Sequence, residues 1–282
     1  MIGTLDPSLI NRAAPPGSMR YFSLLYAPPE RRTVITALYV IDAEIREASQ
    51  SANHDVAHTR QQWWRQEIDR LVRAAPQHPA TRALLENSAV ERSQFERLHE
   101  LAVAADMDLA RMTYANDREL RAYCSRSGGV VQEAIATQLL SPLSLDEASR
   151  SAVNRIGAGV RLTEIIRDLR QDATEGRVYL PIDEMERLAL SIEALRAREV
   201  SNGLRNGLKT LAALASREMG EAEAQLGALQ RAALRPVLVL AGLHKELLRR
   251  IAARNYAIAR ERIELGPVQK PWTAWRAARR AR

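Results

Sequence analysis

Apolar residues recur at three- and four-residue spacing along most of the chain, which is the period of an amphipathic helix. In the segment RRTVITALYVIDAEIREASQ, Val34, Leu38, Ile41 and Ile45 fall on one helical face. The segment HTRQQWWRQEIDRLV repeats the pattern and ends at AAPQHPATRAL, where two prolines break the helix. Further helical runs are predicted at residues 91–105, 117–139, 145–173, 192–229 and 232–263. No alternating strand pattern competes, so the sequence predicts an all-α protein of about eight to ten helices.

The ends of the chain differ in character from its middle. We expect residues 1–282 to form a single domain, because no Gly/Ser-rich linker or internal repeat divides the helical runs. Residues 1–18 are expected to be a flexible lead and residues 267–282 a basic tail. In that tail, Trp272 and Trp275 stand among arginines, a combination that favours peripheral contact with an anionic membrane surface. A solvated, frayed tail is the other interpretation.

Composition and the lengths of the apolar runs indicate where in the cell the protein is expected to lie. Hydrophobic residues make up 46% of the 282 positions, enough for a substantial core. No apolar run approaches the roughly 20 residues needed to cross a bilayer, and the opening MIGTLDPSLINRAAPPGSMR has no hydrophobic targeting segment. Cys124 is the single cysteine, which excludes an intrachain disulfide and a metal site of several thiolates. We expect a cytoplasmic protein, either free or peripheral at the inner membrane face.

The net charge of +7 comes almost entirely from arginine. Such a balance suits anionic partners, including diphosphates and acidic lipids. Nucleic acid is not expected as a partner, because the sequence contains no recognisable nucleic-acid-binding module.

Two aspartates four residues apart, Asp168 and Asp172, lie in the helical segment GVRLTEIIRDLRQDATEGRVYLP. Positions i and i+4 lie on the same helical face, so the two carboxylates should be neighbours. One interpretation is that Arg167 and Arg170 neutralise them at a surface. The other is that they bind Mg²⁺, which takes one or two carboxylates and completes its coordination with water and phosphate oxygens.

Several motifs in order resemble the squalene/phytoene synthase family. IIRDLRQDATEGRVYLP followed by IDEM is similar to the family's second aspartate-rich segment. FSLLYAPPERRTVITALY resembles its opening helix, QQWWRQEIDRL with QHPATRAL its second block, YCSRSGGVV its pocket-lining bend, and RNYAIARERIELGPVQKPW its closing helix. The resemblance extends over most of the chain.

This resemblance implies an isoprenoid-synthase-type bundle of helices around a central apolar cavity, with two aspartate motifs facing each other across its mouth. Active members use Mg²⁺ to remove diphosphate from one prenyl chain and couple it head to head with a second. By resemblance, Asp168 and Asp172 are the metal ligands and Tyr123 lines the pocket, or else Tyr123 is a core tyrosine with a bonded hydroxyl. Arg177 and Tyr179, in the loop after the second motif, are candidates for substrate binding and pocket closure. No short motif identifies an NADPH requirement.

The first aspartate motif is where the sequence departs from the family pattern. Alignment through ALY places Arg46 and Gln50 at its two aspartate positions. Glu44 and Glu47 form a possible substitute pair, although their helical positions point elsewhere. In the second motif, Arg161 and Glu164 stand where active relatives carry Gln and Asn.

Arginine at these positions suggests two roles. If Arg46 projects toward Asp168 and Asp172, its guanidinium can supply the positive charge that Mg²⁺ supplies in the enzymes. Alternatively, Arg46, Arg161 and Arg167 bind a diphosphate directly, without ionisation of the substrate. The candidate substrate-binding residues are therefore Arg46, Arg161, Glu164, Arg167, Arg177 and Tyr179.

Three classes of function remain open. The first is a family member that binds a prenyl diphosphate or related lipid with weak or no head-to-head transfer. The second is an active Mg²⁺-dependent transferase that condenses farnesyl or geranylgeranyl diphosphate. The third is a non-catalytic assembly protein with a protein partner, since RYFSLLYAPPERR…ALYVIDAEIREA resembles the divergent branch that contains a mitochondrial complex I assembly factor.

Overall fold

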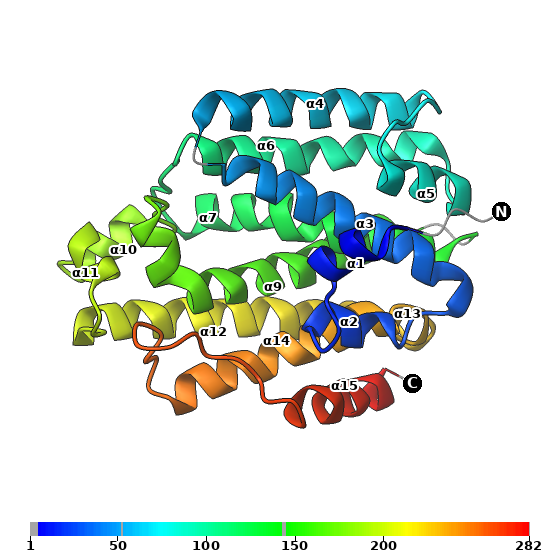
Figure 1. The fold of residues 1–282 in the computed structure, drawn as a ribbon. Helices are drawn as coiled ribbons and strands as arrows, with labels where there is room; N and C mark the ends of the chain where they lie inside the picture. Colours follow the sequence, from blue (N-terminus) through cyan, green and yellow to red (C-terminus); the bar gives the residue numbers. More distant parts are fainter. Residues whose placement is uncertain (1–4, 52, 143–144, 282) are drawn as a thin grey trace.

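The structure is a computed structural model that describes residues 5–51, 53–142 and 145–281, and in these ranges it contains helices and no strand (Figure 1). The all-α prediction is confirmed. The helices are α1 (Pro7–Ala13), α2 (Met19–Leu24), α3 (Pro29–Ser49), α4 (His54–Val72), α5 (Pro79–Asn87), the 3₁₀ helix η1 (Arg92–Leu98), α6 (His99–Leu109), α7 (Asp117–Cys124), the π-helical turn η2 (Ser125–Gly129), α8 (Val130–Leu140), α9 (Glu147–Thr174), α10 (Ile182–Arg187), α11 (Ile192–Arg196), α12 (Asn202–Gln225), α13 (Ala228–Ala233), α14 (Arg235–Ala253) and α15 (Gln269–Arg280).

Capping side chains determine where several of these helices begin. Ser18, Asn53, Asn116, Asp146 and Ser201 each accept a hydrogen bond from a backbone N–H in the first turn of the helix that follows. Each such cap contributes about 1 kcal/mol to helix stability. The short polar residues between the apolar runs therefore place the helix starts.

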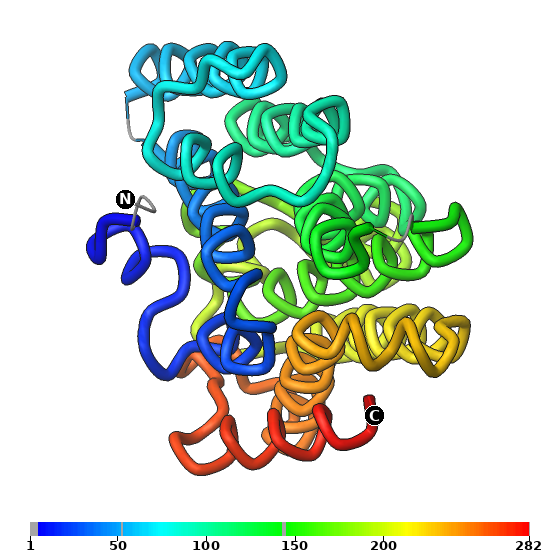
Figure 2. The backbone as a smooth tube through the Cα atoms, turned by 90° about the vertical axis from the view of Figure 1, so that its right-hand side faces the viewer, coloured from blue at the N-terminus to red at the C-terminus, as the bar shows by residue number. Residues whose placement is uncertain are grey.

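Helix α9 lies at the centre of the bundle, between the layer that contains α6 and the layer that contains α14 (Figures 1 and 2). It packs against α8, α12, α14 and η2. Its buried apolar side chains belong to a hydrophobic cluster that includes Leu9 of α1 and Ala278 of α15. The helix with both aspartates is thus anchored on several sides, which holds its polar residues in fixed positions.

The contact between η2 and α9 depends on glycine. A Cβ atom on Gly157 would lie 2.4 Å from the carbonyl oxygen of Gly128, and one on Gly128 would lie 2.5 Å from the carbonyl oxygen of Gly157. The predicted helix at 117–139 is therefore divided into α7, η2 and α8, with the π turn at the bend expected in YCSRSGGVV. The bend directs Tyr123 toward α9.

Two of the predicted helical runs differ in the structure from the bounds expected from the sequence. The run at 192–229 is split into α11 and α12, because Ser201 caps a new helix. The run at 232–263 stops at Ala253, because Asn255 and Tyr256 adopt positive φ angles of 50° and 57°. The chain then returns along the bundle as a loop over residues 254–268, which carries Arg262 to α9.

Both ends of the chain are more ordered than predicted. Residues 1–4 lie outside the described residues, but α1 occupies part of the expected flexible lead and packs on α3 through the buried Leu9 and Ala13. The expected frayed tail forms α15, whose Thr273 and Ala274 are buried. None of the helices in the described ranges has the length and apolar character of a membrane span.

Candidate functional site

Asp168 and Asp172 lie one turn apart on α9, and arginine already contacts both carboxylates. Asp168 accepts hydrogen bonds from Nε of Arg167 at 2.9 Å and from Nε and Nη2 of Arg262 at 2.8 and 3.1 Å. Asp172 accepts a hydrogen bond from Nη2 of Arg177 at 2.9 Å. The prediction that arginine neutralises this pair is therefore confirmed for Arg167.

Arg170, the other arginine predicted to neutralise the aspartates, does not contribute. Its Nε donates to the backbone oxygen of Arg196 at 3.2 Å. The part expected of Arg170 is taken by Arg177 and by Arg262, which comes from the loop after α14.

The two carboxyl groups respond differently to their surroundings. Burial opposes ionisation of both. At Asp168, hydrogen bonds from Arg167 and Arg262 outweigh burial and lower the pKa. At Asp172, burial outweighs the effects of Arg161 and Arg177 and raises the pKa. Asp168 is thus firmly ionised, whereas Asp172 is the easier of the two to protonate.

Arg46 lies across from α9, but it does not contact either aspartate. Its Nε donates to Oδ1 of Asp42 at 2.9 Å, and its Nη1 donates to Oε2 of Glu164 at 3.1 Å. The predicted pairing of Arg46 with Asp168 and Asp172 is wrong. Asp42 precedes Arg46 by one turn of α3, and Glu164 precedes Asp168 by one turn of α9, and these two carboxylates bind the guanidinium instead. Arg46 therefore connects α3 to α9 through a buried ion-pair network.

The network is strongly stabilised in its charged form. Asp42 is 1% exposed and also contacts Arg20 of α2, while the side chain of Glu164 is 17% exposed. Burial opposes ionisation of Glu164, but the charge of Arg46, followed by the nearby His244 and Arg161, keeps its pKa well below the usual range. The Nε2 atom of His244 lies 3.9 Å from Glu164. A buried charge of this kind persists only when it is paired.

Three tyrosines occupy the space behind Arg46. Tyr123 and Tyr179 donate their hydroxyl hydrogens to Asp108 at 2.9 and 2.7 Å, and Tyr114 stacks on Tyr179 with ring centroids 6.2 Å apart. Arg161 donates to the Tyr123 hydroxyl at 2.8 Å. Burial raises the pKa of both Tyr123 and Tyr179, so their hydroxyls stay protonated. Both tyrosines are thus buried and have bonded hydroxyls.

The polar end of α9 borders a cavity of about 390 Å³. Its walls come from the α1–α2 connection, α9, α14 and the loop before α15, and Figure 2 shows the blue α1–α2 connection beside the orange-red loop. Four cations line it, namely Arg20, Arg167, Arg262 and Lys270, together with Leu247. The lining also contains the carboxylates of Glu164 and Glu264, so this cavity has a mixed character and is distinct from the central apolar cavity that the sequence predicts.

The described residues do not fit a Mg²⁺ ion held between two aspartate motifs. Glu44 and Glu47, the possible substitute pair, both contact Arg12 of α1, at 2.8 and 3.3 Å. No group of three His, Cys, Asp or Glu side chains suited to a metal occurs in the described ranges. A divalent ion at Asp168 would have to displace two guanidinium groups and would meet another, from Arg46, across the mouth.

Several residues of this site were not predicted as functional, among them Arg20, Asp42, Asp108, Arg262 and Lys270. Asp42 could have been found, because it precedes Arg46 by four positions, the spacing of a helical ion pair. Arg20, Asp108 and Arg262 reach the site from other segments, and nothing in their local sequence marks them.

Comparisons with known proteins show the family to which the chain is related. The profile of the family described as squalene/phytoene synthase matches residues 14–276. Phytoene synthase 1 of Arabidopsis thaliana is 29% identical over 254 residues, which cover 89% of this chain and 60% of that protein. The 15-cis-phytoene synthase of Synechocystis is 28% identical over 254 residues, which cover 86% of this chain and 75% of that protein. The chain therefore spans about three fifths of the length of the plant protein.

Solved structures show the same fold. A dehydrosqualene synthase in complex with a ligand superposes with a TM-score of 0.74, at 18% identity, over 97% of this chain and 94% of that one. A squalene synthase from Alicyclobacillus acidocaldarius gives a TM-score of 0.69, at 18% identity, over 90% of this chain and 98% of that one. The expected isoprenoid-synthase-type bundle is thereby confirmed.

Proposed function

The chain belongs to the squalene/phytoene synthase family, and we propose that it binds a prenyl diphosphate or a related anionic lipid without joining two prenyl chains head to head. The observation that carries this proposal is the ion pair between Arg46 and Glu164, at 3.1 Å, where the family's first metal-binding motif would face the second. A guanidinium is a fixed, single-charged donor and does not bridge phosphate oxygens as Mg²⁺ does.

The cavity at the mouth supplies the binding chemistry. A volume of about 390 Å³ lies within the common range for small-ligand sites. Guanidinium groups of Arg167 and Arg262 and the ammonium of Lys270 can donate to phosphate oxygens. Leu247 and Leu265 offer apolar surface to the first isoprene units. In this arrangement arginine and lysine hold the diphosphate, and no residue described assists its departure.

A binding experiment with and without metal tests the proposal. Farnesyl and geranylgeranyl diphosphate are titrated into the protein by calorimetry, once with EDTA and once with Mg²⁺, and diphosphate release is measured in parallel. We expect the same Kd in both buffers and no release. Binding that requires Mg²⁺ would overturn the proposal.

Lys270→Gln sharpens this experiment. In the described part of the chain Lys270 has no ion pair, so its removal leaves no carboxylate uncompensated. Loss of one charged hydrogen bond is expected to weaken binding about tenfold. The matched control is Lys209→Gln, which removes an exposed lysine of α12. Equal losses in the two variants would show that net charge, and not this cavity, controls binding.

The active transferase remains the alternative that this assay detects. It predicts Mg²⁺-dependent diphosphate release that is lost in Asp168→Ala. Such a result would mean that Mg²⁺ displaces Arg167 and Arg262 from Asp168, and it would contradict the role given to Arg46.

One observation favours a third function, that of an assembly protein. The Arg46 network is neutralised by its own carboxylates, Asp42 and Glu164, so the fold needs no ligand to compensate these charges. An assembly protein predicts no binding of prenyl diphosphate in either buffer and a protein complex that survives Lys270→Gln. Binding of the diphosphate in EDTA separates the two functions.

A prenyl ligand also implies a location. Each buried CH₂ group contributes about 0.8 kcal/mol to partitioning into a bilayer, so long prenyl chains reside in membranes. We therefore propose that the protein works at the cytoplasmic face of a membrane.

A further inference from the structure

Helix α15 is held against the bundle by a close contact that leaves one side of it open. A Cβ atom on Gly242 of α14 would lie 2.7 Å from the Cβ of Ala277, so the two helices approach where α14 has no side chain. Thr273, Ala274 and Ala278 are buried in this contact. The tail is thus a fixed helix, and its remaining side chains have defined positions.

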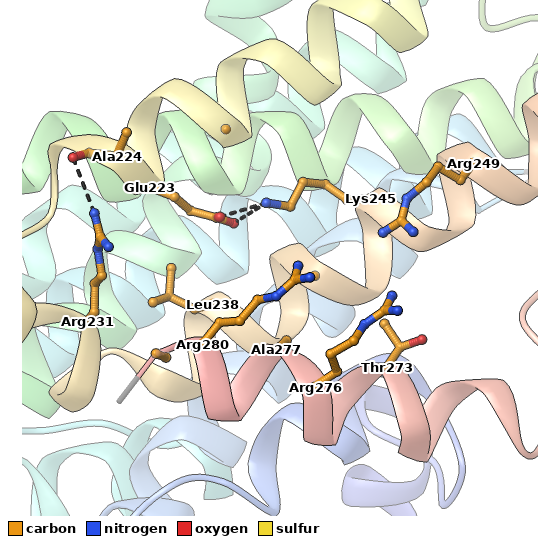
Figure 3. Close-up of a pocket in the computed structure, with 13 residues that line it drawn as sticks. Glu223, Ala224, Arg231, Leu238, Lys245, Arg249, Thr273, Arg276, Ala277 and Arg280 are labelled. Carbon is orange, nitrogen blue, oxygen red and sulfur yellow. Dashed lines mark hydrogen bonds and ion pairs between the residues drawn. The ribbon is translucent and has the colours of Figure 1, made fainter.

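A basic groove lies between α12, α14 and α15, with a volume of about 320 Å³ (Figure 3). Figure 3 shows the side chains of Arg249, Arg276 and Arg280 directed toward the same space from α14 and α15. The cations that line the groove are Arg231, Lys245, Arg249, Arg276 and Arg280, against one lining carboxylate, Glu223. None of its lining residues is shared with the cavity beside Glu164.

The cations of this groove are only partly compensated. Lys245 pairs with Glu223 at 2.6 Å, while Arg249 and Arg276 share the carboxylate of Glu246 at 2.6 and 3.3 Å. Arg280 has no ion pair within residues 5–51, 53–142 and 145–281. Guanidinium hydrogens therefore remain available for an anion with several oxygens, such as a phosphate group.

Two tryptophans stand beside the groove on the same helix. Trp272 and Trp275 are 58% and 41% exposed, and their rings stack with centroids 4.9 Å apart. Val268, at the start of the helix, is 78% exposed. Trp272 lies one turn before Arg276, so indole and guanidinium alternate along neighbouring turns. Exposed indoles next to arginine are typical of a membrane interface, where the ring sits at headgroup level.

From this juxtaposition we infer that α15 docks the protein on anionic phospholipid, with the indoles of Trp272 and Trp275 at the interface and a headgroup phosphate in the Arg249–Arg276–Arg280 groove. An acidic protein segment would also complement the arginines, but two neighbouring exposed indoles beside a row of basic residues match the headgroup level of an anionic membrane in both respects. The inference stands apart from prenyl diphosphate binding, because it uses a different surface.

Vesicle co-sedimentation tests the docking surface. The full-length protein is mixed with vesicles of phosphatidylcholine alone or with about one third phosphatidylglycerol, and the partition coefficient is measured. We expect binding only to the anionic vesicles. Arg276→Gln/Arg280→Gln should lower partitioning about 30-fold, since each basic residue near such a surface contributes about a factor of five.

A matched control separates the groove from net charge. Arg92→Gln/Arg198→Gln removes two exposed arginines on η1 and after α11, with no ion pair in the part of the chain that the structure describes. This control should change partitioning less than twofold. Circular dichroism and thermal unfolding confirm that each variant is folded. Equal losses in both double variants would overturn the groove assignment.

Tryptophan fluorescence tests whether the indoles of Trp272 and Trp275 lie at the membrane interface. Vesicles that carry brominated acyl chains quench indoles that enter the bilayer interface. Quenching should be lost in Trp272→Phe/Trp275→Phe, which still emits through Trp63 and Trp64. Unchanged quenching, or binding to neutral and anionic vesicles alike, would overturn the inference. Binding of an acidic peptide in place of vesicles would identify a protein partner and overturn it as well.

Discussion

Replacement of Arg46 by glutamine is expected to destabilise the protein strongly. The guanidinium is 2.9 Å from Asp42 and 3.1 Å from Glu164, and the two carboxylates are 1% and 17% exposed. At an effective dielectric constant of about 20, one such contact amounts to on the order of 5 kcal/mol before desolvation is counted. Removing one member of a buried pair costs about 3–5 kcal/mol, because the remaining charge stays buried. We expect about 4 kcal/mol for Arg46→Gln.

A double-mutant cycle isolates the part of this loss that comes from the pair. Glu164→Gln alone leaves Arg46 with Asp42, whereas Arg46→Gln/Glu164→Gln removes both charges and leaves Asp42 paired with Arg20. Removing both members of a buried pair is often close to neutral. The double variant is therefore expected to be more stable than Arg46→Gln alone.

Urea unfolding followed by circular dichroism measures each free energy, and thermal unfolding gives a second reading. A loss of about 4 kcal/mol should lower Tm by roughly 8 °C at this chain length. If the two single losses simply add in the double variant, Arg46 and Glu164 do not interact, and the account of the closed mouth is refuted. A stability of Arg46→Gln within about 0.5 kcal/mol of the unchanged protein would refute it equally.

Three further predictions concern other parts of the interior. Gly157→Ala should destabilise the protein by about 1–3 kcal/mol in urea unfolding, because its Cβ would lie 2.4 Å from the Gly128 carbonyl oxygen; an unchanged midpoint would contradict that close approach. Burial raises the pKa of the Cys124 thiol to about 12, so alkylation by iodoacetamide at mild alkaline pH should proceed only as the chain unfolds; mass spectrometry would show rapid native labelling if this is wrong. The pKa of Glu164 is lowered in the folded state, so its stabilising contribution is complete above its unfolded pKa of about 4.3 and is lost as the pH falls through the folded pKa. The difference in unfolding free energy between the unchanged protein and Glu164→Gln should therefore become smaller as the pH is lowered. A difference that does not change with pH would contradict the ionised, paired state assigned to Glu164.

The features that local sequence encodes were predictable. Helix α9 was expected at 145–173 and is found at Glu147–Thr174, because its apolar period is long and uninterrupted. The bend in YCSRSGGVV was expected from the resemblance to the family, and the structure shows that glycine there allows the close approach of η2 to α9. The resemblance of ordered motifs indicated the family, which the profile match over residues 14–276 confirms.

The partners of the charged residues were not predictable in the same way. Arg262 reaches Asp168 only because the chain turns back after α14, and Arg20 reaches Asp42 only because α2 packs against the bundle. These contacts depend on tertiary packing and not on spacing. The order of the tail was not predictable for a related reason, since α15 packs against Gly242 of α14, a contact that the sequence of the tail does not mark.

The side chains at positions 46 and 164, where departures from the family pattern are expected from the sequence, compensate each other in charge. They are separated by 118 positions in the sequence, yet their side chains meet at 3.1 Å with opposite charges. Arg46 without Glu164 would place a guanidinium between Asp42 and the positive Arg161, and Glu164 without Arg46 would add a third acid to the face that carries Asp168. Together they close the mouth with a neutral pair. For the same reason, aspartate at position 46 alone would bring three carboxylates together, those of Asp42, Glu164 and the new side chain, without the guanidinium that now pairs with them. Recovery of a metal site would therefore require changes at positions 46 and 164 together, and Asp168 would have to be released from Arg262.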